Sequence, residues 1–93
     1  MGKAQYFHLS IQSDFSNLST VADVITQAAG EWQLDDRQTY NIQMEVDEAV
    51  TNVIEHAYRG RKDGIIQVSC ERKGDEVIVE IQDFGTPFGI IGR

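Results

Sequence analysis

Residues 45–58 read EVDEAVTNVIEHAY, and this stretch holds the pattern on which the fold depends. It belongs to a longer run, from Arg37 to Tyr58, in which apolar residues recur every three or four positions. The set is Ile42, Val46, Ala49, Val50, Val53, Ile54 and Ala57. This spacing predicts an amphipathic helix over residues 37–58 that buries one face. Leu34-Asp35-Asp36 offers a cap before the helix, and Gly60 is the expected stop after it.

The segments around this helix predict the rest of a small α+β domain. Phe7, Leu9 and Ile11 alternate with polar residues, which is typical of a half-buried strand. Apolar positions at helical spacing between residues 18 and 32 predict a first helix. Two further alternating runs, 66–71 and 77–82, flank a Lys73-Gly74-Asp75 turn and predict a hairpin. The order strand, helix, helix, strand, strand predicts a single domain over residues 1–93, with both helices on one face of a mixed sheet.

Composition and charge narrow the class of protein. The chain has 93 residues, of which 41% are hydrophobic and 25% charged, as in an ordinary small globular domain. The 15 acidic and 8 basic residues leave a net charge of −7, which argues against direct binding to nucleic acid. Cys70 is the single cysteine and has no partner for an internal disulfide. Since no apolar stretch reaches the length of a membrane span, we expect a cytoplasmic protein without a membrane partner.

Polar residues form a stripe along one face of the predicted helix 37–58. The stripe comprises Glu45, Glu48, Asn52 and either Glu55 or His56, at steps of three and four. A carboxylate at Glu48 and an amide oxygen at Asn52 suit a hard cation such as Mg²⁺, and a carboxylate can also take a proton from an attacking hydroxyl. A solvated helix face explains the same spacing, and the spacing alone favours it. Taken by itself, His56 is interpreted as a packed or capping histidine near the helix end.

Asp83 stands out at the end of the last predicted strand. It has the parity of Val77, Val79 and Ile81, so it continues the inward face of that strand. A carboxylate on that face needs a partner, because burying an unpaired charge is costly. The interpretation stays open between an acceptor for a ligand amine at the floor of a pocket and a cap for the following turn. Gly85, two residues on, would let the backbone approach a ligand closely.

Two of these strings resemble motifs of a known family. Glu48–Tyr58, EAVTNVIEHAY, resembles the N box of the anti-sigma factor serine/threonine kinases, within the wider Bergerat-fold (GHKL) ATPase superfamily. Asp83–Phe88, DFGTPF, resembles the proline-containing form of the first glycine box in those kinases. The order of the predicted elements also matches, and the resemblance covers nearly the whole chain. It implies a two-layer α/β sandwich of the Bergerat type.

The resemblance also implies an activity and its residues. In such kinases Asn52 would hold the Mg²⁺ that bridges the phosphates of ATP, and Glu48 would be the general base. Asp83 would accept a hydrogen bond from the exocyclic amine of adenine, and Gly85 would let the ring approach. The nucleotide-binding residues that the resemblance implies are Asn52, His56, Asp83, Gly85 and Thr86.

Partners are implied by the same resemblance. The kinases of this family act as dimers, sequester a sigma factor and phosphorylate a serine or threonine of an anti-anti-sigma (STAS-type) protein. Their lid and second glycine-rich box do not follow the first glycine box here, where the sequence reads GIIGR up to Arg93. We therefore expect a C-terminally incomplete sandwich and a homodimer. The alternative is a non-catalytic, truncated relative that serves as a partner-binding or dimerisation module.

Overall fold

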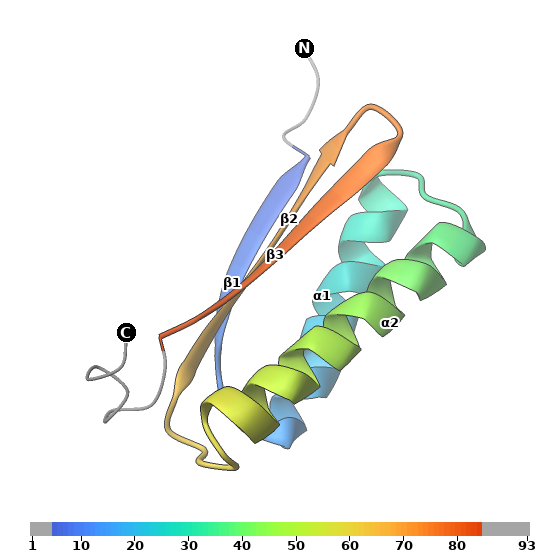
Figure 1. The fold of residues 1–93 in the computed structure, drawn as a ribbon. Coiled ribbons are helices and arrows are strands. Elements are labelled where there is room, and N and C mark those ends of the chain that lie inside the picture. Colours follow the sequence, from blue (N-terminus) through green and yellow to red (C-terminus); the bar gives the residue numbers. More distant parts are fainter. Residues whose placement is uncertain (1–4, 85–93) are drawn as a thin grey trace.

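The computed structural model describes residues 5–84, in which two helices pack on one face of a three-stranded sheet (Figure 1). In chain order the elements are β1 (Tyr6–Gln12), a 3₁₀ turn (Phe15–Asn17), α1 (Leu18–Glu31), α2 (Asp36–Asn52), a π-helical turn (Val53–Ala57), β2 (Ile65–Lys73) and β3 (Glu76–Asp83). The expected two-layer α+β sandwich is confirmed. In the part of the chain described, no helix is long and apolar enough to cross a membrane.

The sheet has the order β1-β2-β3, and both of its strand pairs are antiparallel. The sequence pattern predicts a mixed sheet, but the three described strands form no parallel pair. The reason is the even number of helices between β1 and β2: α1 carries the chain away from the end of β1 and α2 returns it (Figure 1). The chain therefore enters β2 beside the end of β1, where Gln12 faces Ile65. One helix in place of two would favour a parallel pair.

The core fills the space between the helices and the inner face of the sheet. Four of its side chains, from α2 and β2, are entirely buried: Val46, Val50, Ile66 and Val68. At the other end of the sheet, Trp32 stacks on Phe7 with ring centroids 6.1 Å apart and packs near Cys70. Burial raises the pKa of the Cys70 thiol to about 11, so this group stays protonated at neutral pH and behaves as the small core residue the pattern predicts.

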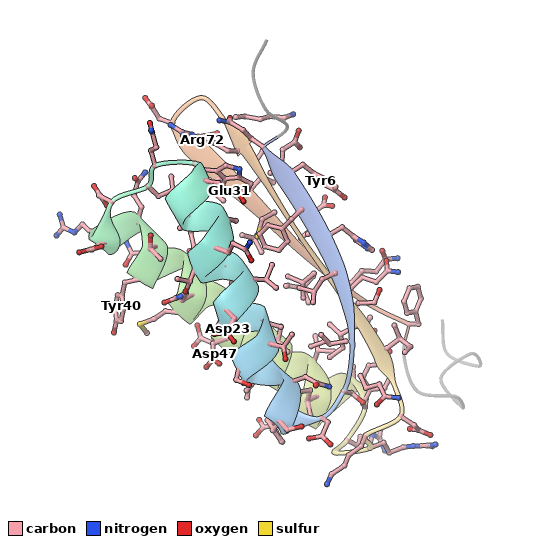
Figure 2. All side chains as sticks on the ribbon, turned by 180° about the vertical axis from the view of Figure 1, so that it is seen from behind. Tyr6, Asp23, Glu31, Tyr40, Asp47 and Arg72 are labelled. Carbon is pink, nitrogen blue, oxygen red and sulfur yellow. The ribbon has the colours of Figure 1, made fainter. Side chains whose placement is uncertain are left out.

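Side-chain hydrogen bonds hold the start of α2 and the end of α1. The predicted cap of α2 is confirmed as a capping box, in which the Asp35 carboxylate accepts from the Gln38 N–H (2.8 Å) and the Gln38 side chain accepts from the Asp35 N–H (3.3 Å). At the C-terminal end of α1, the Arg72 guanidinium donates to the carbonyl oxygen of Trp32. Figure 2 shows Arg72 beside that end of the helix, where its positive charge is favourable.

The end of the second helix differs from the prediction. The sequence predicts a helix to Tyr58, whereas α2 ends at Asn52 and continues as the π turn, with the Tyr58 N–H donating to the Val53 oxygen at 3.0 Å. A π turn adds one residue to the turn, so the residues after it are rotated by about 100° relative to a regular helix. That rotation brings Tyr58 over the core, where it is 1% exposed. Gly60, with φ of 81°, is the predicted stop.

Candidate functional site

Glu48 and Asn52 both lie on α2 with exposed side chains. They are four positions apart, which corresponds to about 6 Å along the helix axis and about 40° around it. The buried side of α2 is marked by Val46 and Val50, so the carboxylate and the amide lie on its accessible part. Because Mg²⁺ keeps several waters and takes few protein ligands, an exposed carboxylate and amide oxygen one turn apart fit that ion.

Asp83 is the last residue of β3 and lies on the inner face of the sheet, as its parity predicts. It faces Ile66 of β2, which is fully buried beneath the helices, and Ile66 in turn faces Ile11 of β1. The Asp83 side chain is half-buried at this end of the sheet. Since α2 packs against β3, the helix with the polar stripe and the strand with the inward carboxylate are neighbours (Figure 1).

One contact joins the two predicted motifs directly. The backbone N–H of Phe84, the residue after Asp83, donates to the hydroxyl of Tyr58 at 2.9 Å. Tyr58 is the last residue of the string that begins at Glu48, and the sequence analysis assigned it no role. The sequence offers one sign of such a role: Tyr58 carries a hydroxyl and stands two residues before Gly60, the expected stop of the helix.

Of the remaining predicted residues, the structure describes only His56. His56 lies in the π turn with an exposed side chain, and its role in binding stays a prediction. In a regular α-helix, His56 would lie one turn beyond Asn52, in the same row of side chains as Glu48 and Asn52. The π turn has more residues per turn, so the direction of the His56 side chain around the helix axis differs from that row. Gly85 and Thr86 lie outside the described residues.

A groove of about 520 Å³ runs between α1 and α2. Its walls include Val21 and Ile25 of α1, and Tyr40 and Asp47 of α2, the last two of which Figure 2 labels on the outer side of the helices. Glu48 and Asn52 contribute to its lining, but Asp83 does not. The groove therefore does not unite the three predicted residues: Glu48 and Asn52 lie at its lining, and Asp83 lies outside it, at the end of β3. We place the candidate site where this part of α2 adjoins the end of β3.

A family model supports the assignment of these motifs. The model of the histidine kinase-like ATPase domain matches residues 11–91, which covers most of the chain and both motifs. This match runs from the end of β1 through the helix of Glu48 to the strand of Asp83.

Curated relatives give a narrower comparison. The chain is 36% identical over 53 residues to the serine-protein kinase RsbW of Listeria innocua, which covers 57% of this chain and 34% of that protein. It is 44% identical over 45 residues to an anti-sigma F factor of Clostridium botulinum, and 40% identical over 45 residues to one of Clostridium beijerinckii. Each of these two matches covers 48% of this chain, and the matched part spans about a third of each relative's length. The fold, the paired motifs and the family match agree, and the chain belongs to the histidine kinase-like ATPase domain family.

Proposed function

We propose that this chain forms the Mg-ATP-binding part of an anti-sigma factor that is also a serine/threonine protein kinase. The observation that carries the proposal is the placement of Asp83, on the inner face at the end of β3, beside the helix that presents Glu48 and Asn52. The family of ATPase domains to which the chain belongs supports ATP as the ligand. The relatives named serine-protein kinase and anti-sigma factor support the class of activity.

Each of the three residues has a distinct task in this proposal. The Asp83 carboxylate accepts a hydrogen bond from the exocyclic amine of adenine and so selects the base. The Asn52 amide oxygen holds the hydrated cation, and bound Mg²⁺ supplies the positive charge that neutralises the phosphates. The Glu48 carboxylate accepts the proton of the attacking serine or threonine hydroxyl, and the helix holds it near that hydroxyl.

The proposal includes two protein partners, and the relatives named anti-sigma factor support the first of them, a sigma factor. A sigma factor is the protein to be held, and an anti-anti-sigma protein of the STAS type is the acceptor of the phosphoryl group, in the cytoplasm. We include a homodimer in the proposal. β1 and β3 form the two edges of the sheet in the described part of the chain, and an exposed edge strand is a surface through which chains associate.

A calorimetric titration of the full chain with Mg-ATP tests the nucleotide site. Replacing Asp83 with Asn keeps the size of the side chain but presents an amide in place of the charged acceptor. We expect Asp83→Asn to weaken ATP binding about 10- to 100-fold, which corresponds to the loss of a hydrogen bond to a charged group.

Glu80→Gln is the matched control, because Glu80 lies on the same strand with its side chain exposed on the outer face. This variant should bind ATP as the wild type does. A folded wild-type chain that binds no nucleotide, or binding equal in the Asp83→Asn variant, would contradict the proposal. The first of these results would favour the non-catalytic partner-binding module instead.

A further inference from the structure

The end of β3 is held by a side chain that reaches it from the helix layer. The Tyr58 hydroxyl donates to the carbonyl oxygen of Ile65 at 2.6 Å and accepts from the N–H of Phe84 at 2.9 Å. Ile66 faces Asp83, so in the same register Ile65 faces Phe84. The hydroxyl thus bridges two facing backbone groups where the direct ladder between β2 and β3 ends, and it does so one residue beyond Asp83.

The position of this hydroxyl is set by the glycine over which its ring packs. A Cβ atom on Gly64 would lie 2.4 to 2.6 Å from three carbons of the Tyr58 ring, so the ring occupies the space that a side chain at position 64 would need. The ring itself is 1% exposed and belongs to the main core cluster. Tyr58 therefore has little room to move its hydroxyl.

Hydrogen bonds to Ser13 hold the backbone of Gly64 in place. Ser13, which is fully buried after β1, accepts from the Gly64 N–H at 3.0 Å and donates to the carbonyl oxygen of Arg61. The Ser13 N–H also donates to the Gly64 oxygen at 2.9 Å. Through these bonds the loop between the π turn and β2 is tied to the end of β1, and the Tyr58 ring packs against Gly64 of this loop.

From this chain of contacts we infer that Tyr58 is a positioning residue for nucleotide recognition, acting through Asp83. The inference rests on the proposed function. Asp83 has its backbone held on one side by the pairing with Ile66 and on the other by the Tyr58–Phe84 bond. Losing the hydroxyl leaves the Phe84 N–H without this partner and releases the strand end, so that the carboxylate is no longer held in one orientation.

The test compares Tyr58→Phe, Asp83→Asn and the double variant with wild type, each as the full chain titrated with Mg-ATP. Tyr58→Phe keeps the packed ring and removes only the hydroxyl. We expect it to weaken ATP binding about tenfold in the wild-type background and less than about twofold in the Asp83→Asn background. A merely structural role would weaken binding equally in both backgrounds, and that result would overturn the inference.

The triphosphate of purine riboside, which lacks the exocyclic amine, gives a second readout. Tyr58→Phe should change its affinity by less than about twofold, because the lost orientation of Asp83 affects only the contact with that amine. An equal loss for both nucleotides would overturn the positioning role. Tyr6→Phe is the control, since Tyr6 is 55% exposed on β1, and it should leave both affinities unchanged.

Amide hydrogen exchange separates this inference from the proposed function. Without nucleotide, Tyr58→Phe should raise the exchange rate of the Phe84 amide about tenfold, while amides in the middle of β3 keep theirs. An unchanged Phe84 amide would overturn the positioning role whether or not ATP binds. Failure of the wild-type chain to bind ATP would overturn the proposed function and, with it, the role of Tyr58 in recognition.

Discussion

Replacing Glu48 with Gln is expected to lower the rate of phosphoryl transfer to an anti-anti-sigma protein by about 10²- to 10⁴-fold. Glutamine has nearly the same size and keeps a hydrogen-bonding oxygen, but it cannot accept the proton of the attacking hydroxyl. Because the Glu48 side chain is exposed on α2, the fold should be unaffected. The measurement is single-turnover transfer from ATP to the purified partner, with nucleotide affinity measured in parallel.

Asp47→Asn is the matched control for this prediction. It removes one negative charge from the same helix, one residue away and about 100° around the axis, and the proposal gives Asp47 no role. It should keep the wild-type rate, so a loss common to both variants would indicate a general effect of charge. Transfer that survives Glu48→Gln unchanged would remove Glu48 from the mechanism.

Replacing Gly64 with Ala is expected to lower the free energy of unfolding by about 2–4 kcal/mol. The added Cβ would lie 2.4 Å from Cε1 of Tyr58, so either the ring or the loop must shift. Overpacking of this kind costs about 1–3 kcal/mol, and displacing the hydroxyl also weakens its two hydrogen bonds. Denaturant unfolding monitored by circular dichroism measures the difference.

Gly30→Ala is the contrasting variant. Gly30 lies in α1 with no atom near the place of a Cβ, so alanine there should stabilise the chain by about 0.5–1 kcal/mol. A double-mutant cycle with Tyr58→Leu locates the clash, since Gly64→Ala should cost clearly less once the ring is gone. The assignment of the clash to the ring fails if Gly64→Ala costs the same in both backgrounds.

Much of the fold can be predicted from periodicity in the sequence. The helix boundaries near Leu18 and Asp36, and the capping box at Asp35, agree with the apolar spacing and the cap residues. Asp83 is predicted to lie on the inner face of the sheet because it is separated from Val77 by an even number of positions. Its pairing with Ile66 confirms this prediction. These features are local, or repeat along one element, so a pattern within one segment is sufficient to predict them.

The parts that the sequence analysis missed depend on contacts between segments. The π turn is needed to bring Tyr58 over the core, and regular helical spacing gives no sign of the extra residue. The fit of the Tyr58 ring against Gly64 joins residues in different elements and has no periodic signal. The antiparallel pairing of β1 with β2 depends on the path of two helices rather than on the strands themselves.

Mapping bound Mg-ATP onto the chain shows whether the nucleotide lies between α2 and the end of β3. The experiment adds Mg-ATP to the ¹⁵N-labelled chain and monitors each backbone amide by NMR. We expect the largest shifts on the part of α2 from Glu48 onwards and on the end of β3 around Asp83 and Phe84. Shifts confined to the groove between α1 and α2, around Ile25 and Tyr40, would contradict it, and so would a spectrum of the folded chain that ATP leaves unchanged.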